Sequence, residues 1–326
     1  MQTLYPFKLN PVFKEKIWGG HKIRQQLKMD FGLLPNCGEA WLLSGVEGNP
    51  TVVNNGYLAG NEINELVEVF MGDLVGDAVY ERFGDQFPIL VKVIDSNDWL
   101  SIQVHPDDEL AQKRGIGYGK TEMWYVMQAD ENAELISGFN QEVDELIYLS
   151  YLENNRLKEI MNTEKVGKGD VFFMPAGRVH ALGPGTLIAE IQQTSDTTYR
   201  IYDWGRVDEK GNSRELHTEE ALEAIDYTLH SQYKTPYQLS DNNTVSLVDS
   251  PFFTTGILRL TQAISKDYSE LDSFVILFCT EGSLSLEYEN ESYSIRAGEV
   301  ILLPNVISQV SLIPDPDAVV LEVYIA

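Results

Sequence analysis

The segment from residue 169 to residue 180 constrains the fold of this 326-residue chain more than any other stretch. Residues 169–174 are typical of a short apolar strand, residues 175–177 form a Pro-Ala-Gly turn signal, and a second strand opens at His180. Strands that follow each other across short turns are the building blocks of all-β domains. The segment therefore predicts a β scaffold that presents a histidine at the start of a strand.

A second stretch, residues 101–105, alternates polar and apolar residues. Side chains two positions apart on a strand share a face, so Gln103 and His105 point the same way. Together with His180, two strands can aim two imidazoles and an amide oxygen into one barrel, and Glu122 could add a carboxylate. Nitrogen and oxygen donors of this kind suit a metal ion.

Composition excludes several classes of partner. The formal net charge is −26 and the pI is about 4.4, which argues against nucleic acid and anionic membranes. A small phosphorylated substrate stays possible, because a few local cations and a metal can make a positive pocket in an acidic protein.

Location is predicted from three further features. No apolar run approaches the roughly 18 residues of a membrane helix, and the N-terminus lacks the pattern of a signal peptide. Cys37 and Cys279 lie far apart in sequence, which favours two free thiols over a disulfide framework. We therefore expect a cytoplasmic protein.

The pattern along the chain predicts a mainly β protein with helical insertions. Apolar spacing predicts a helix over residues 61–83 with Asn61 as its N-cap, and further helices are expected at residues 107–114, within 142–163 and at 218–227. Strands are expected at residues 89–94, 100–104, 124–128, 133–138, 171–174, 187–192 and 199–202.

The C-terminal region has a different character. Residues 252–326 consist of short strand patterns, with turn signals at 281–282, 289–290 and 304–305. The stretch 240–244 is the best linker candidate. We predict a catalytic, metal-binding domain at residues 1–240 and a small β domain at residues 241–326.

A weak internal repeat relates the two regions. Residues 169–175 align with residues 298–304, and continuing the alignment places His180 opposite Gln309. The C-terminal copy keeps the strand and the turn but lacks the histidine. Two related barrels are expected, with metal ligands in the first one alone.

These segments resemble the cupin motifs. Residues 169–180 match the second motif at both glycines, the proline and the histidine, although Pro184 stands where the motif usually ends in asparagine. The first motif is altered, because its His-x-His is Gln103-x-His105 and its glutamate comes late, at Glu122. The resemblance implies two cupin-like jelly-roll β-barrels with helical insertions.

Those departures are themselves typical of the class I mannose-6-phosphate isomerases in their short bacterial form, which the chain resembles from about Pro11 to its C-terminus. Two N-terminal stretches, residues 16–20 and 38–41, are similar to that family. The shared motifs are Gln-x-His-Pro-Asp from residue 103, Gly-Lys-x-Glu-x-Trp-Tyr from 119, Pro-x-Gly-x-x-His-Ala from 175 and Ser-Asp-Thr-Thr-Tyr-Arg-x-Tyr-Asp from 195.

The resemblance implies a zinc-dependent isomerase that interconverts mannose 6-phosphate and fructose 6-phosphate through a cis-enediol. One Zn²⁺ per chain and a monomer or homodimer are expected. The ligands that it implies are Gln103, His105, Glu122 and His180.

The resemblance also marks Arg200, Lys120 and Glu190 as active-site residues. Negative charge develops on oxygen in an enediol, and a nearby cation stabilises that charge. Arg200 stays protonated and suits the reacting oxygens or the phosphate, and Lys120 could do either job or transfer a proton. Glu190 is a candidate base or a substrate-hydroxyl anchor, although a carboxylate in an apolar strand could equally form a structural salt bridge.

Other interpretations stay open at this stage. A site of two histidines and one carboxylate also fits an Fe(II) oxygenase of the cupin type, and the chain could be a non-catalytic sugar-phosphate-binding module. Lys120 could be a solvated loop lysine, and Arg200 could lie on the surface beside its neighbouring tyrosines. The five tryptophans are expected to pack in the core.

Overall fold

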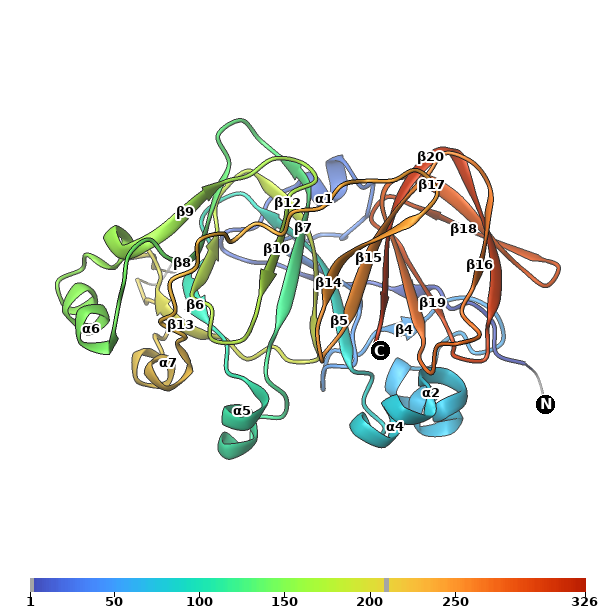
Figure 1. Ribbon diagram of the computed structural model, residues 1–326, viewed down its shortest axis with the longest axis horizontal. Helices are drawn as coiled ribbons and strands as arrows, with labels where there is room; N and C mark the ends of the chain where they lie inside the picture. The colour runs from blue at the N-terminus through green and yellow to red at the C-terminus, as the bar shows by residue number, and fades with distance from the viewer. Residues whose placement is uncertain (1–2, 208–210) are drawn as a thin grey trace.

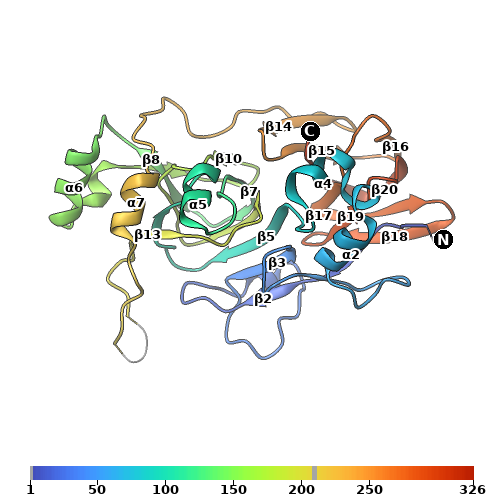
Figure 2. The same cartoon turned by 90° about the horizontal axis from the view of Figure 1, so that it is seen from below.

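The computed structural model describes residues 3–207 and 211–326. It confirms the predicted mainly β fold, in which two jelly-roll units lie side by side along the long axis of the molecule (Figure 1). Short helices cover the ends and edges of the two units rather than separating them (Figure 2). Within the described ranges, none of the helices has the length and apolar character needed to cross a membrane.

The first unit consists of two antiparallel sheets. The six-stranded sheet has the order β10-β7-β12-β5-β3-β2, and the five-stranded sheet has the order β13-β6-β11-β8-β9. The strands of the first sheet are β2 (Val12–Lys14), β3 (Glu39–Leu43), β5 (Ile89–Ser96), β7 (Glu122–Ala129), β10 (Val171–Met174) and β12 (Thr186–Gln193). Those of the second are β6 (Ile102–Val104), β8 (Glu134–Phe139), β9 (Met161–Lys165), β11 (His180–Leu182) and β13 (Tyr199–Tyr202).

The six-stranded sheet is covered on both faces, which explains why its central strands read as nearly continuous apolar runs. All eight residues of β5 and all eight of β12 are buried. One face lines the interior of the first unit around Trp124 and Phe172. The other face packs into a large core that continues into the C-terminal unit, where it includes Phe253 and Phe274.

The C-terminal unit is a single seven-stranded sheet folded on itself. Its order is β14-β15-β20-β17-β18, with β16 paired to β20 and β19 paired to β17. The strands are β14 (Thr244–Asp249), β15 (Thr254–Leu260), β16 (Ile264–Asp267), β17 (Val275–Tyr288), β18 (Glu291–Arg296), β19 (Val300–Leu303) and β20 (Gln309–Tyr324).

One turn prediction in this unit is wrong. Glu281 and Gly282 were expected to end a strand, but they lie inside β17, which continues to Tyr288. The pairing with β20 shifts between Cys279 and Glu281 and again after Gly282, whose φ is +72°. A bulge of this kind bends a strand without ending it, so the Gly signal marks a bend rather than a hairpin.

The helices confirm the sequence pattern except at one place. The continuous helix expected at residues 61–83 is three helices, because Met71 and Gly76 take positive φ values of 46° and 96°. The N-cap is Glu62 rather than Asn61, since Glu62 and Glu65 form a reciprocal capping box. The helices are α1 (Lys22–Gln25), α2 (Ile63–Phe70), α3 (Gly72–Val75), α4 (Asp77–Phe83), α5 (Asp108–Arg114), α6 (Glu145–Glu153), the 3₁₀ helix η1 (Leu157–Ile160) and α7 (Thr218–Ala224).

The N-terminal segment reaches across to the C-terminal unit. Phe7 pairs with Leu302 of β19 through two backbone hydrogen bonds. The following strand β1 (Leu9–Asn10) pairs with β4 (Val52–Val53) in a separate two-stranded sheet. The division at residue 240 stays a prediction, and these contacts tie the first residues of the chain to the second unit.

Candidate metal centre and active site

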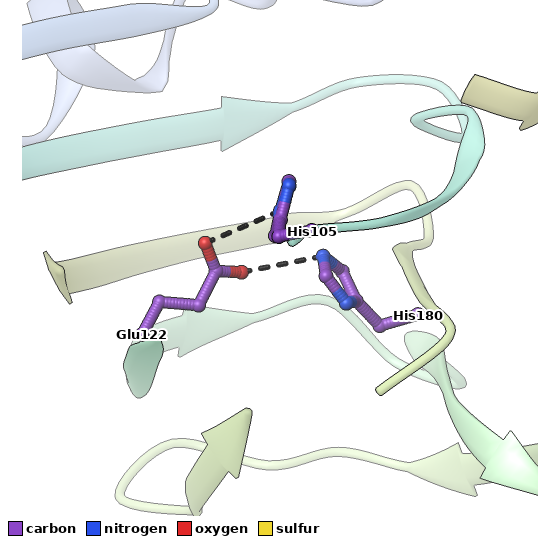
Figure 3. Close-up of side chains that lie close together, drawn as sticks. All are labelled: His105, Glu122 and His180. Atoms are coloured by element: carbon purple, nitrogen blue, oxygen red, sulfur yellow. Dashed lines mark ion pairs between the residues drawn. The ribbon is translucent and has the colours of Figure 1, made fainter. Parts of the chain in front are cut away.

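The fold brings His105, Glu122 and His180 together although they lie far apart in the chain. His180 opens β11 and pairs with Gln103 of β6, so His105, two residues further on, lies on the same side. Glu122 opens β7 in the facing sheet. Figure 3 shows the carboxylate pointing between the two imidazole rings.

The distances within this cluster are short. Glu122 Oε1 lies 3.3 Å from His180 Nε2, and Glu122 Oε2 lies 3.5 Å from His105 Nε2. One donor atom from each residue falls within 4.8 Å of the others, and all three side chains are buried. A single metal ion could contact all three.

Each histidine is oriented by a backbone carbonyl. His105 Nδ1 lies 2.9 Å from the oxygen of Thr197, and His180 Nδ1 lies 2.8 Å from the oxygen of Arg178. A carbonyl can only accept, so Nδ1 carries the hydrogen in both rings and the Nε2 lone pair faces Glu122. Metal-binding histidines are commonly held by a partner of this kind.

The ionisation of the cluster also fits a cation. Burial lowers the pKa of His180 to about 4 and that of His105 well below its usual range, with Lys120 adding to the effect at His105. Burial and the charge of Glu190 raise the pKa of Glu122 to about 7. Neutral imidazoles can bind a metal directly. The ionised form of a buried carboxylate is disfavoured, and a metal cation would supply the positive charge that stabilises it.

The surroundings of Glu122 test whether a metal fits. Neither carboxylate oxygen accepts a hydrogen bond of normal geometry from any residue that the structure describes. Lys120 Nζ lies 2.9 Å from Oε2 as an ion pair. Buried carboxylates normally have their oxygens satisfied, and two neutral histidines aimed at unsatisfied oxygens leave a place for a metal ion. The three residues therefore fit the group that the sequence motifs implied.

Gln103 lies at the edge of this cluster. Its amide nitrogen is 3.3 Å from His180 Nε2, and its amide oxygen lies 3.4 Å from the hydroxyl of Ser101. In this orientation the amide nitrogen, rather than the oxygen, faces His180. Turning the amide by half a turn brings the oxygen to the same place.

Lys120 and Arg200 both line a pocket whose wall also includes Gln103. Lys120 Nζ lies 3.0 Å from His105 Nε2, which rules out a solvated loop lysine. Arg200 of β13 pairs directly with Gln103 of β6, so the two side chains share a face. Its guanidinium is half-buried and donates to the backbone oxygen of Glu215 at 2.8 Å.

Glu190 is held in a buried network on the pocket floor. Lys92 Nζ lies 2.9 Å from Oε1, and the indole nitrogen of Trp124 donates to Oε2 at 2.8 Å. Burial alone would raise the pKa of Glu190, but the charges of Lys92 and Lys120 lower it. The salt bridge that the sequence left as an alternative is thus present.

Several pocket residues were not identified from the sequence. The pocket has a volume of about 190 Å³, and six cationic side chains line it in a chain of net charge −26. Trp18, Trp41 and Trp124 are buried as expected, but they also form part of its wall. The cations are Lys14, Lys16, Lys92, Lys120, Arg200 and Arg214.

One signal for the missed residues was present in the sequence. Lys92 is the single charge in an otherwise apolar strand pattern, and Glu190 is the single charge in another. The two residues lie directly opposite each other on β5 and β12. Arg214 gave no such signal, because it comes from a loop and is positioned by its ion pair with Asp203.

Comparison with known proteins gives the same assignment to both ends of the chain. The family model "Phosphomannose isomerase type I, catalytic domain" matches residues 6–138. The family model "Mannose-6-phosphate isomerase, cupin domain" matches residues 243–317.

Similar proteins extend over almost the whole chain. A mannose-6-phosphate isomerase of Bacillus subtilis, ManA, is 35% identical over 313 residues, covering 93% of this chain and 94% of that protein. A mannose-6-phosphate isomerase of Streptococcus mutans is 34% identical and covers 93% of each chain. The crystal structure of the Bacillus subtilis mannose 6-phosphate isomerase superposes with a TM-score of 0.85 at 31% identity, covering 98% of this chain and 99% of that one.

Proposed function

The chain belongs to the type I phosphomannose isomerases, and on that premise we propose that it interconverts mannose 6-phosphate and fructose 6-phosphate through a cis-enediol. The observation that carries the proposal is the buried His105–Glu122–His180 cluster, which contacts Lys120 and Gln103 in the lining of a pocket with six cations. A cupin oxygenase does not account for that concentration of positive charge, and a non-catalytic sugar-phosphate-binding module does not account for the His105–Glu122–His180 cluster.

We propose zinc as the metal. His105, Glu122 and His180 would hold it, with Gln103 as a fourth ligand after rotation of its amide. Two neutral imidazoles, a neutral amide and one carboxylate leave Zn²⁺ with a formal charge of about +1. The bound ion would supply electrostatic stabilisation of negative charge on the substrate oxygens.

The cationic side chains differ in what they contact. Lys120 contacts two of the proposed ligands, so it lies beside the reacting carbons and is the better placed group for moving a proton. Arg200 and Arg214 also line the pocket, and Arg200 faces the same way as Gln103. Arginine is well suited to bidentate binding of phosphate or of paired oxygens.

Glu190 is assigned to substrate positioning. Its lowered pKa keeps it ionised, and both oxygens already accept from Lys92 and Trp124. A carboxylate stabilised in this way is a weak base. It can still accept from a sugar hydroxyl, because each carboxylate oxygen has more than one lone pair. We therefore propose that it anchors a hydroxyl rather than taking the proton.

The proposal is tested by the rate of fructose 6-phosphate formation from mannose 6-phosphate. Protein stripped with a chelator serves as the blank, and re-addition of zinc should restore a rate that stripping abolishes. Unphosphorylated mannose is the control substrate, and we expect it to react far more slowly because it lacks the phosphate that the cations of the pocket would bind. No rate in the zinc-loaded sample would contradict the assignment.

Zinc affinity should depend on pH in a defined way. Binding requires an ionised Glu122, whose pKa in the metal-free protein is about 7, whereas the histidines stay neutral over the same range. The affinity is expected to fall about tenfold between pH 8 and pH 6, because a proton increasingly competes with the metal. Competition with a chelator of known affinity measures this. An affinity that is flat across that interval would contradict the role of Glu122.

The remaining assignments rest on composition and on the family. We infer a cytoplasmic enzyme, since Cys37 and Cys279 are both free thiols and both buried. The net charge of −26 argues against nucleic acid as a partner, and a sugar-phosphate substrate and a monomeric or homodimeric state are predicted from the family. Catalysis is assigned to residues 1–240, and residues 241–326 are proposed to form the unit without metal ligands.

A further inference from the structure

The strand pairing relates the two units residue by residue. In the first unit, Met174 of β10 pairs with Glu122 of β7. In the C-terminal unit, Leu303 of β19 pairs with Val275 of β17. Gly169 and Gly298 precede these strands with nearly identical φ values of 90° and 91°. The internal repeat therefore extends from sequence to backbone conformation and register.

The sequence alignment placed Gln309 opposite His180, but the residue of the C-terminal unit that faces inward at this place is the next one, Val310. Gln309 is exposed, whereas Val310 is buried in the interior core of the unit. Val310 pairs with Lys266 of β16, as His180 pairs with Gln103 of β6. By this register, the counterparts of Gln103, His105, Glu122 and His180 are Lys266, Tyr268, Val275 and Val310. No metal site can form from the side chains at those four positions.

One charged residue of the active site is nevertheless kept. Glu190 pairs with Trp124, and the residue at the same register in the C-terminal unit is Glu322, which pairs with Leu277. Glu322 is buried, and its carboxylate accepts from Tyr268 at 2.5 Å and from Thr244 at 3.0 Å. A carboxylate is expensive to bury, so its presence in an interior that has lost the metal ligands calls for a reason.

The cation that neutralises this carboxylate has moved. Lys92 faces Glu190 in the first unit, but Gly256 stands at that position opposite Glu322. The ammonium comes instead from Lys266, whose Nζ lies 2.9 Å from Glu322 Oε1 and occupies the register of a proposed metal ligand. The C-terminal unit thus carries a fixed ammonium on the side where the first unit would carry its metal.

A cavity of about 560 Å³ opens at this carboxylate. It lies between β14, β16 and β20, the strands that correspond to β3, β6 and β12 around the active-site pocket. The side chains of Thr244, Lys266, Tyr268, Glu322 and Tyr324 line it. A polar cluster, a cavity and the same place in the fold therefore coincide.

We propose that the C-terminal unit holds a second, metal-free binding site for an uncharged sugar or polyol, centred on Lys266 and Glu322. Lys266 Nζ already reaches Thr244 and both oxygens of Glu322, so a sugar hydroxyl would bind by exchanging with one of these contacts between an ammonium donor and carboxylate acceptors. The rings of Tyr268 and Tyr324 provide apolar surface for the carbon skeleton.

The charge of the cavity selects against the substrate of the first unit. Its lining has one cation, Lys266, and three carboxylates, Asp267, Glu270 and Glu322. The active-site pocket is lined by six cations and three carboxylates, so its balance of charge is positive whereas that of the C-terminal cavity is negative. A phosphate monoester would be repelled from the C-terminal cavity at neutral pH, so the ligand is expected to be unphosphorylated.

Saturation-transfer NMR with D-mannose on the full-length, zinc-loaded enzyme tests this inference. A large excess of the equilibrium mixture of mannose 6-phosphate and fructose 6-phosphate occupies the active site. We expect the D-mannose signal to persist under these conditions. Loss of the signal when the sugar phosphates are added would show that D-mannose binds the active site alone, and would overturn the inference.

Two variants locate the site. Lys266→Met combined with Glu322→Gln removes both charges together, so that no unpaired buried charge is left, and Ser269→Trp fills the exposed mouth of the cavity. Each is expected to weaken D-mannose binding at least tenfold with isomerase kcat unchanged. Lys113→Met, which alters an exposed ion pair with Glu223, is the control. Unchanged D-mannose binding in the folded Ser269→Trp enzyme would equally overturn the inference.

Discussion

Replacing Glu122 by Gln is expected to lower kcat/KM for mannose 6-phosphate by roughly 10³-fold and to weaken zinc binding strongly. Glu122 is the only anionic member of the proposed ligand set and lies between both imidazoles. Gln keeps the shape of the side chain while removing its charge. The loss should therefore come from the metal and its charge, not from repacking.

The stability of the metal-free variant provides a second readout. The pKa of Glu122 is raised to about 7, so the ionised carboxylate destabilises the metal-free fold increasingly as pH rises from about 4.5 through 7. Metal-free Glu122→Gln should consequently be at least as stable as the metal-free parent at pH 8, and the difference should shrink toward pH 5. Thermal unfolding at both pH values measures it.

A matched control exists in the other unit. Glu322→Gln combined with Lys266→Met removes the buried ion pair at the register of Glu190 without leaving an unpaired charge, and it touches no proposed ligand. It should keep its zinc and its turnover. Zinc content close to one per chain in Glu122→Gln, with a rate near that of the parent, would remove Glu122 from the ligand set.

The sequence predicted the core of this site because the constraints there are local. A strand that opens with His180 after a Pro-Gly turn, and a strand that alternates through Gln103 and His105, fix which side chains share a face. Glu122 was a possible carboxylate ligand from the residues alone, and the family resemblance was needed to assign it to the set. The structure then brought His105, Glu122 and His180 together as one buried group.

The Lys92–Glu190 pair shows where such prediction stops. Each residue is the single charge in an apolar strand, which predicts that it has an oppositely charged partner. The identity of that partner depends on the register between β5 and β12. That register depends on packing across two sheets and is not encoded in either strand alone. Arg214 is further out of reach, because a loop and its ion pair with Asp203 position it.

Helix boundaries failed for a related reason. The apolar spacing over residues 61–83 is genuinely helical, and the three observed helices keep it. The spacing of apolar residues does not report backbone dihedral angles, and the breaks between the helices depend on positive φ at Met71 and Gly76. Phe274, which directly precedes β17 of the C-terminal unit, donates its backbone N–H to the carbonyl of Val75. The second break therefore lies at a contact with a segment that is distant in sequence.

Replacing Arg200 by Ala is expected to lower kcat/KM by about 10²–10³-fold while the enzyme keeps its zinc and its fold. Arg200 lies opposite Gln103 across the β13–β6 pair and lines the pocket. Its guanidinium Nε is buried and has no hydrogen-bond partner among the residues that the structure describes. A permanent cation that lines the pocket and keeps a donor unused is suited to bind an oxygen of the substrate.

The fold should tolerate the change. The hydrogen bond that the guanidinium makes to the protein runs to the backbone oxygen of Glu215, which solvent can replace. Arg200→Lys separates charge from geometry, because it restores the charge without the planar fork. Its rate should lie between those of the parent and the Ala variant if a bidentate contact matters. Arg156→Ala, which removes an exposed ion pair with Glu159, serves as the control.

Kinetic parameters decide what Arg200 binds. If the guanidinium holds the phosphate in the ground state, Arg200→Ala should raise KM with a smaller change in kcat; if it stabilises charge on the enediol oxygens, kcat should fall with little change in KM. The measurement requires both parameters for both substrates, with zinc content and thermal unfolding checked for each variant. Turnover near that of the parent with unchanged KM would exclude both roles for Arg200. Lys120 and Arg214 would then be the candidates among the cations that line the pocket.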